Sequence, residues 1–285
     1  MSKSPIDIEL LIRQAQSLHP LPQSVTRLAQ MMSGEGWTMT EVVEAISYDQ
    51  TLTVRLLAMA NSAAFAAQNE IRTVRDAVVR LGAGAVLSLA MAATVQSHLD
   101  RGVPQYGLGE GDLWDHSVAA AVSVQALATR AKADLPAESF TAAVLHDIGK
   151  LLISRHLDAN LLERLARARD EEGRCGFLAE VEVLGIHHGQ LGAMMARSWG
   201  LPAEIVRGIE YHHDPLAGGG GVCHVVHVAN GLAHMVIDTG PCSGHEPTPE
   251  PGSLEALGLT REDMTQLVTT VGDQLDEVLQ RYAVH

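Results

Sequence analysis

Apolar residues recur along most of this chain with the spacing of an α-helix. Val25, Leu28, Ala29 and Met32 occupy positions i, i+3, i+4 and i+7, which places them on one face of a helix. The same spacing continues to the C-terminal region, where it predicts a long helix over residues 261–282. Between these two, it predicts helices over residues 41–46, 51–60, 73–81, 84–96, 113–131, 139–145, 161–172, 177–184, 191–199, 204–213 and 222–235.

Local signals mark the ends of several of these helices. Thr38 with Glu41 forms a capping-box pair, in which each side chain bonds the other residue's backbone amide. Thr73 precedes Asp76 at the start of the next long segment, and Gly82 supplies a stop at its end. Propensity, periodicity and end signals therefore agree on short, closely spaced helices.

No segment alternates strictly between apolar and polar residues, as a half-buried strand does, so the sequence predicts an all-α fold. Stretches rich in Gly, Pro and small polar residues predict breaks at residues 97–112, 218–221 and 238–253. We expect an N-terminal helical subdomain over residues 1–100, a second helical bundle over residues 101–236, and a loop with an amphipathic helix over residues 237–285.

Composition narrows the classes of protein to consider. The 285 residues carry a net charge of −14, which argues against a nucleic-acid partner because such binding depends largely on Lys and Arg. Cys175, Cys223 and Cys242 are odd in number and widely spaced, as in a protein with reduced thiols. The N-terminus lacks the apolar core of a signal peptide, and no apolar run is long enough to span a membrane. We therefore expect a cytoplasmic protein without a membrane partner.

Histidines next to apolar segments are the main candidates for chemistry. The sequence Leu-His-Asp-Ile-Gly-Lys places His146 and Asp147 side by side at the end of a predicted helix, with Lys150 one turn later. Imidazole nitrogens and carboxylate oxygens both bind divalent transition metals. Further histidines follow other helical segments, as in a site assembled from several helices: His116, His188, His212 and His213.

These sequence motifs, in this order, resemble those of the HDOD domain of bacterial signalling proteins over roughly residues 15–235. In the N-terminal half the matching words are Leu21-Pro22-Gln23 and the segments at residues 46–53, 56–62 and 76–82. In the second half they are Trp114-Asp115-His116-Ser117, residues 145–150, Leu184-Gly185 with His188, Gly192-Ala193, Trp199-Gly200-Leu201-Pro202 and residues 209–213. The resemblance implies an N-terminal helical subdomain followed by an HD-like helical bundle.

HDOD domains are similar to the HD and HD-GYP metal-dependent phosphohydrolases, and this similarity implies roles for the residues at matching positions. The implied metal ligands are His116, His146, Asp147, His188, His212 and His213. Lys150 matches a lysine near the substrate phosphate, so Lys150 and Asp147 are the candidate catalytic residues. The implied cofactor is a divalent transition metal, Fe or Mn in preference to Zn.

Two departures count against a complete enzyme. Asn230 occupies the position expected for the family's last aspartate ligand, and an amide oxygen is a poorer ligand for a cation than a carboxylate. The Gly-Tyr-Pro word is also missing after His212 and His213. Asp112, one turn before His116, is a further candidate for a carboxylate ligand. The alternative to a metal site is a set of hydrogen-bonded relic histidines, and His187, His224, His227 and His234 are interpreted as core or surface residues.

These features support two main hypotheses and one weaker one. The first is a regulatory, signal-transducing module that binds a signalling protein or a nucleotide-like ligand. The alternative is a metal-dependent phosphohydrolase that acts on a nucleotide or cyclic dinucleotide, its metal activating a water for attack on phosphorus. A nucleic-acid adaptor is the weaker third hypothesis, because the acidic balance disfavours it.

Overall fold

The computed structural model describes residues 22–33, 36–61, 71–156, 158–170, 176–237 and 248–282, together with Arg13. Within these ranges the fold is all-α, as predicted, with one isolated bridge between Val103 and Leu108 in place of any strand. Cys175, Cys242 and residues 238–247 of the predicted loop lie outside the described residues, whereas Cys223 is a buried free thiol.

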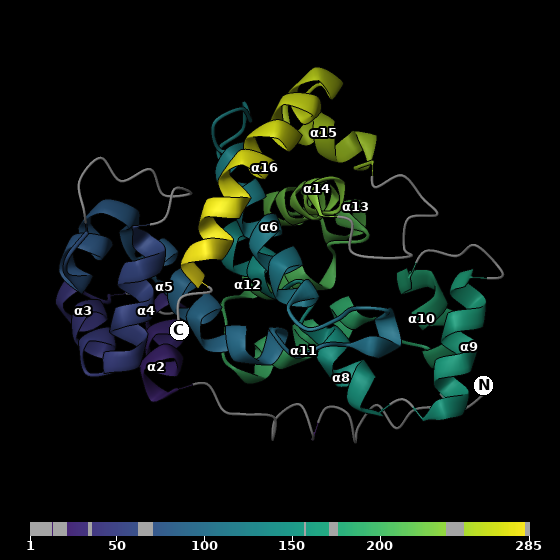
Figure 1. The fold of residues 1–285 in the computed structure, drawn as a ribbon. Coiled ribbons are helices and arrows are strands. Elements are labelled where there is room, and N and C mark those ends of the chain that lie inside the picture. The colour runs from purple at the N-terminus through teal and green to yellow at the C-terminus, as the bar shows by residue number, and fades with distance from the viewer. Residues whose placement is uncertain are drawn as a thin grey trace.

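The N-terminal helices form one group at one end of the molecule (Figure 1). Their bounds are α2 (Gln23–Ser33), α3 (Met39–Ser47), α4 (Gln50–Ala60) and α5 (Val74–Leu99). The predicted stripe on α2 is buried at Val25, Leu28 and Ala29. The predicted capping box of Thr38 and Glu41 is present on α3, and the side chain of Thr73 caps α5.

The predicted stop at Gly82 falls inside α5. Gly82 has φ 81° and ψ 159°, a conformation outside the helical region that glycine adopts without steric cost, so the backbone of α5 breaks there. Among the described residues, α5 is the one helix long and apolar enough to cross a membrane, yet 61% of its most apolar window is buried inside the protein. The burial and the break at Gly82 are typical of a core helix.

The second bundle follows a short connection that contains the 3₁₀ helix η2 (Pro104–Tyr106). Its helices are α6 (Asp112–Leu127), α7 (Ser139–Leu145), α8 (Gly149–His156), α9 (Ala159–Asp170), α10 (Gly176–Leu184), α11 (His188–Ser198), α12 (Ala203–Glu210), α13 (Pro215–Gly218) and α14 (Gly221–Val236). Helices α6 and α14 pack along each other at the centre, and α9 and α10 form a pair at the edge (Figure 1).

The C-terminal region adds α15 (Pro251–Leu257) and α16 (Arg261–Tyr282). Helix α16 packs against α6 and α14 and also contacts α4, so it touches both helical groups. Helix α5 likewise packs on α3 and α4 and contacts α7. The three-part division of the chain remains a prediction, because helices on both sides of its boundaries share one buried core.

Other sequence predictions also differ from the structure. The helix predicted to reach residue 131 ends at Leu127, where the Thr129 hydroxyl bonds the carbonyl of Ala126. Helix α8 is absent from the helices predicted from the sequence. In the structure, a Cβ at Gly149 would lie 1.9 Å from the carbonyl oxygen of His188, so glycine permits close packing of α8 on α11. Helix α15 begins at Pro251, inside the predicted loop, because proline suits the first turn of a helix.

Candidate metal centre

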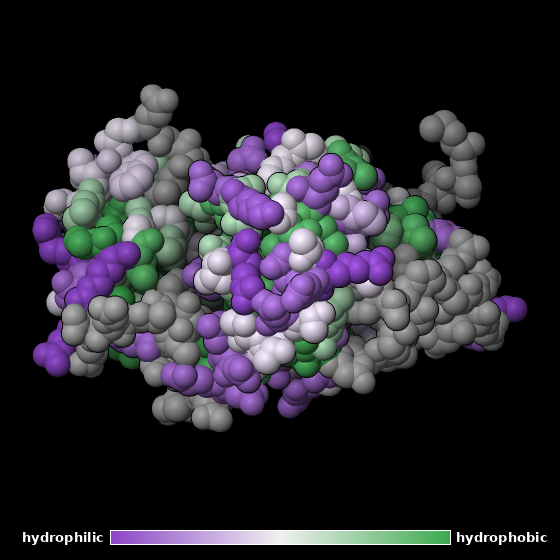
Figure 2. All heavy atoms as spheres, turned by 90° about the horizontal axis from the view of Figure 1, so that it is seen from above, coloured by the Kyte–Doolittle hydropathy of each residue, from purple (hydrophilic) through white to green (hydrophobic). Residues whose placement is uncertain are grey.

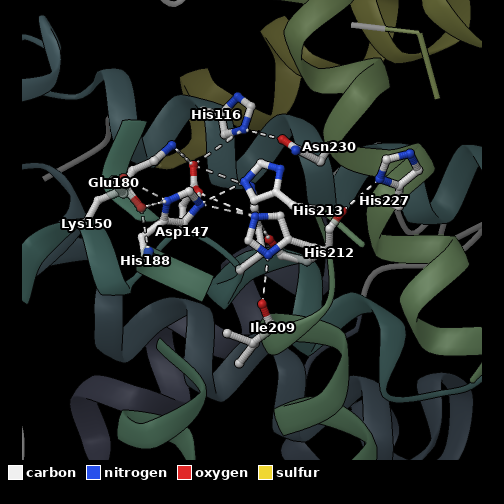
Figure 3. Close-up of polar contacts among 12 residues, drawn as sticks. His116, Asp147, Lys150, Glu180, His188, Ile209, His212, His213, His227 and Asn230 are labelled. Carbon is white, nitrogen blue, oxygen red and sulfur yellow. Dashed lines mark hydrogen bonds and ion pairs between the residues drawn. The ribbon is translucent and has the colours of Figure 1, made fainter. Parts of the chain in front are cut away.

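The structure brings the six predicted ligands together at the middle of the second bundle (Figure 3). They come from four places in the fold: the first turn of α6, the α7–α8 junction, the start of α11 and the segment after α12. Most of these side chains are buried, with exposed fractions of 0% to 3%, and His213 is half-buried. The five buried side chains are those of His116, His146, Asp147, His188 and His212.

Asp147 lies at the centre of this cluster. Its Oδ1 is 3.1 Å from His188 Nε2 and 4.0 Å from His212 Nε2. Its Oδ2 is 3.4 Å from His146 Nε2 and 3.7 Å from His116 Nε2. The two carboxylate oxygens thus face different pairs of imidazoles, and Asp147 joins the two halves of the site.

Three histidines are oriented in the same way. His146 and His212 each donate Nδ1–H to a carbonyl three residues earlier, of Ala143 and Ile209, at 2.7 Å. The Nδ1 of His188 bonds the carboxylate of Glu180 at 2.8 Å. An acceptor at Nδ1 fixes the tautomer that leaves Nε2 free to bind a metal, which is the usual arrangement of metal-binding histidines.

Glu180 is a site residue that sequence reasoning missed. Its carboxylate accepts hydrogen bonds from the backbone amide of His188 at 2.6 Å and from the hydroxyl of Tyr106 at 2.8 Å. The side chain is 1% exposed on α10, beside buried Ala179 and Val183. A glutamate inside the apolar face of a predicted helix was the available signal, because buried carboxylates need partners.

His116 contacts the predicted replacement of the aspartate ligand. Its Nε2 donates to the Oδ1 of Asn230 at 2.9 Å, and its Nδ1 has no hydrogen-bond partner. The ring of His234 lies 4.4 Å from that of His116, centroid to centroid, so His234 belongs to the surroundings of the site. Asp112 instead accepts a hydrogen bond from the amide of Gly109, a capping role in the loop before α6 that explains its spacing without a ligand role.

Lys150 contributes the one ammonium group that contacts the cluster in the described part of the chain. Its Nζ is 2.6 Å from the Oδ2 of Asp147, and its side chain is 16% exposed. Burial opposes ionisation of Asp147, but the positive charge of Lys150 and the hydrogen bond from His188 outweigh it and hold the pKa of that carboxyl well below its usual value. Asp147 is therefore an anion at neutral pH.

The histidines divide into two electrostatic groups. Burial lowers the pKa values of His116, His146, His212 and His213, so these rings are neutral at pH 7. Burial also disfavours the charged form of His188, but Glu180 outweighs it and raises the pKa of His188 to about 8. Neutral imidazoles are the form that binds metals, so a metal ion bound by His188 must displace a proton from its Nε2.

The donor set fits a divalent metal ion. Two groups have ligand atoms within 4.8 Å of one another: His188 with His212 and His213, and His116 with His146 and Asp147. The buried Nε2 of His146 makes no hydrogen bond, which without a cation costs about 1–3 kcal/mol.

The spacing of the nitrogens also fits. His188 Nε2 lies 3.2 Å from His212 Nε2 and 3.0 Å from His213 Nε2. Two nitrogens bound to one metal at about 2.1 Å are about 3.0–3.4 Å apart.

The remaining histidines brace the surrounding structure. His227 donates to the carbonyl of His212 at 2.7 Å and accepts from the amide of Glu250 at 2.9 Å. His224 bonds the hydroxyl of Ser253 at 3.0 Å, and His187 is the N-terminal cap of α11. These contacts agree with their interpretation as structural residues, although His227 ties the C-terminal region to a predicted ligand.

An all-helical fold with a buried His–Asp centre defines the class of this protein, and comparison with known proteins gives the family. The HDOD domain model matches residues 18–215, and the chain belongs to this family. A structure from Shewanella amazonensis SB2B named "Putative phosphohydrolase" is 27% identical, with a TM-score of 0.69 over 99% of both chains. An HDOD domain protein with unknown function from Geobacter sulfurreducens is 25% identical, with a TM-score of 0.68 over 98% of both chains.

A curated relative extends the comparison to a longer protein. An uncharacterized protein of Treponema pallidum (strain Nichols) is 23% identical over 200 residues, which make up 68% of this chain. The matched part covers 37% of that relative, so the relative contains much sequence with no counterpart here.

Proposed function

We propose that this protein is a regulatory HDOD module whose buried histidine–aspartate centre binds a divalent transition metal ion. The observation that carries the proposal is the shared orientation of three histidines around Asp147. Each is held at Nδ1 by a carbonyl or carboxylate and directs Nε2 into the cluster. Relic histidines would need no common orientation, whereas these three rings all direct the nitrogen that can bind a metal toward one carboxylate.

A regulatory role fits the centre better than rapid turnover does. The imidazoles around Asp147 are almost fully buried, so a phosphate ester must displace protein atoms to reach them. Lys150 is bonded to Asp147, where it neutralises the carboxylate. Asn230 supplies an amide oxygen in place of a second carboxylate. A metal held in this way stabilises one arrangement of helices α6, α7, α11 and α12, which a partner can recognise.

The donor types also bear on the metal and the partner. Imidazoles with one carboxylate and one amide suit Mn(II) and Fe(II), whereas structural zinc sites are commonly rich in thiolate ligands. Cys223 bonds the carbonyl of Arg207, away from the cluster. We expect the partner to be a signalling protein or a nucleotide-like ligand, and the net charge of −14 disfavours nucleic acid.

Metal content tests this proposal most directly. Protein purified without chelator or histidine tag is offered Mn(II) or Fe(II) without oxygen, and bound metal is measured by elemental analysis and by the rise in Tm. We expect near-stoichiometric metal that disappears in the double variant His146→Ala/Asp147→Ala. The matched control is His224→Ala/Asp276→Ala, which removes the same residue types outside the cluster. Equal, low metal in all three proteins would contradict the proposal.

A metal-dependent phosphohydrolase is the second candidate. Lys150 and half-buried His213 lie at the more exposed edge of the cluster, where an ammonium group can neutralise a phosphate. The name of the Shewanella structure points in the same direction. The metal-loaded protein is assayed with bis(4-nitrophenyl) phosphate, nucleotides and cyclic dinucleotides. Turnover that requires metal and is lost in His146→Ala/Asp147→Ala would establish this function in place of the purely regulatory one.

A further inference from the structure

The two oxygens of Asp147 lie in different electrostatic surroundings. Oδ2 already has a positive charge beside it, because the ammonium of Lys150 is 2.6 Å away and is attached through the first turn of α8. Oδ1 faces imidazole nitrogens of His188 and His212. Figure 3 shows Lys150 reaching the carboxylate of Asp147 beside these rings.

We propose that the centre binds a single metal ion, on the Oδ1 side of Asp147, and that Lys150 takes the place of a second ion at Oδ2. This inference rests on the proposed metal-binding function and specifies its stoichiometry. The metal would be held by Oδ1 together with Nε2 of His188, His212 and His213. The Nε2 atoms of His212 and His213 lie 3.2 Å and 3.0 Å from the Nε2 of His188, and these distances match neighbouring ligands of one ion.

The Oδ2 side is less able to hold an ion of its own. His116 uses its Nε2–H to bond the Oδ1 of Asn230, so this nitrogen is a donor and offers no lone pair to a metal. Asn230 is neutral where a carboxylate would offset positive charge. The ligands that remain near Oδ2 are His146 and Asp147 itself. The Lys150 ammonium is 2.6 Å from Oδ2, closer than the Nε2 atoms of His146 (3.4 Å) and His116 (3.7 Å).

The charges lead to the same stoichiometry. Asp147 is the one carboxylate that faces the ligand nitrogens of both halves, while Glu180 lies behind His188. Two divalent ions and the Lys150 ammonium would bring five positive charges against these two carboxylates in a buried site. Like charges a few ångströms apart repel strongly in an environment of low dielectric constant. One divalent ion with Lys150 leaves a much smaller imbalance.

Mn(II) titration of the full-length chain tests the inference. Lys150→Met removes the ammonium and keeps the length of the side chain, and Lys132→Met removes an exposed lysine outside the cluster as the matched control. Bound Mn(II) is counted by equilibrium dialysis with elemental analysis, and electron paramagnetic resonance distinguishes isolated ions from coupled pairs. We expect one isolated ion in the native protein and in Lys132→Met, and two coupled ions in Lys150→Met.

Two ions in the native protein, or one in Lys150→Met, would overturn the inference. No ion in the native protein would instead overturn the proposed function on which it rests. If Lys150→Met does not fold, Lys150→Gln tests the same idea, because it also removes the ammonium beside Oδ2 and keeps a polar side chain at this partly exposed position. We expect Lys150→Gln to bind two ions, and a single ion there would count against the inference.

Discussion

The N-terminal helices and the second bundle share one hydrophobic core but differ in the polar side chains that they bury. Ser88 is the one buried polar side chain among the described residues of the N-terminal group. Polar groups there cap helix ends, as Thr38 and Thr73 do. Among its described residues, the second bundle buries seven histidine, acidic and amide side chains: His116, His146, Asp147, Glu180, His188, His212 and Asn230.

This contrast separates residues that maintain the fold from residues that perform a function. Burying a polar group is unfavourable unless it is hydrogen-bonded, and an apolar residue of similar size is often as stable or more so. Both groups expose some large hydrophobic residues, with the largest exposed fractions at Tyr48 (81%) and Val54 (68%) of the N-terminal group, and hydrophobic atoms are visible at that end of the molecule in Figure 2. The comparison predicts that variants in the second bundle change metal binding, whereas those in the N-terminal group change stability alone.

Asp147→Asn tests this contrast with the largest expected effect. The substitution keeps the shape of the side chain but removes the charge that Lys150 and the histidines surround. We expect metal binding to be lost and the metal-free protein to be destabilised by about 3–5 kcal/mol, as when one partner of a buried ion pair is removed. Urea unfolding with and without Mn(II) measures both effects. An unchanged rise in stability with Mn(II) would show that the metal binds elsewhere.

Leu56→Ala is the matching substitution in the N-terminal group. Leu56 is fully buried on α4, and its truncation leaves a cavity that costs about 2–5 kcal/mol. We expect urea unfolding to show this loss while the metal content per folded chain stays at the native value. A large fall in metal content would mean that the two groups are coupled and would break the comparison.

Glu180→Gln examines a contact behind the ligands. Glutamine has a single accepting oxygen, so it can accept from the Tyr106 hydroxyl or from the His188 amide but not from both, and it no longer presents a charged carboxylate to His188 Nδ1. Loss of such a contact typically weakens metal affinity about 10- to 100-fold. Competition between the protein and a calibrated chelator measures this change. The neighbouring variant Glu182→Gln, on the exposed side of α10, should bind metal with native affinity.

Most helices could be predicted from the sequence because their causes are local. The capping pair of Thr38 and Glu41, the stop at Gly82 and the stripe of α16 depend on residues within a few positions of one another. Helix α8 could not be predicted, because the need for glycine at position 149 arises from the backbone of His188 on another helix. The sequence contains Gly149 but not the distance to that carbonyl.

The candidate site also contains residues that the sequence could identify and residues that it could not. The clustering of the predicted ligands followed from the resemblance to HD proteins, since each lies in a recognisable word such as His146-Asp147. Glu180 and Tyr106 lie in no such word, and their hydrogen bond joins residues 74 positions apart. The resemblance suggested a phosphate-binding role for Lys150, and the three-residue spacing from Asp147 was the available signal for the ion pair that the structure shows.

The pH dependence of stability provides a smaller test within the second bundle. Burial, helped by Lys150, lowers the pKa of His234 from 6.5 to about 4. As the pH falls below 6.5, His234 becomes protonated in the unfolded chain, whereas in the folded protein it stays neutral until the pH approaches 4. Protonation therefore stabilises the unfolded chain, and the folded protein loses stability over this pH range. Between pH 7 and pH 5 the loss is about 2 kcal/mol.

Urea unfolding of metal-free protein at pH 7 and pH 5 measures this loss. His234→Gln does not titrate, so its stability should fall by about 2 kcal/mol less than that of the native protein over this range. His188 has the opposite sign, since its raised pKa of about 8 adds stability that is lost above pH 6.5. It is present in both proteins and cancels in the difference. Equal slopes in the two proteins would show that His234 does not titrate as its burial requires.

Thr73→Ala should have the smallest effect and sharpens the contrast from the N-terminal side. The Thr73 hydroxyl accepts the amide of Asp76 at 3.0 Å in an exposed position, and removal of such a cap costs about 1 kcal/mol. Thr73→Ser keeps the accepting oxygen and should unfold close to the native midpoint. Because the cap lies outside the buried centre, the rise in Tm with Mn(II) should be equal in native protein, Thr73→Ala and Thr73→Ser. A smaller rise in Thr73→Ala alone would show that the start of α5 contributes to the metal centre through α7, which α5 contacts.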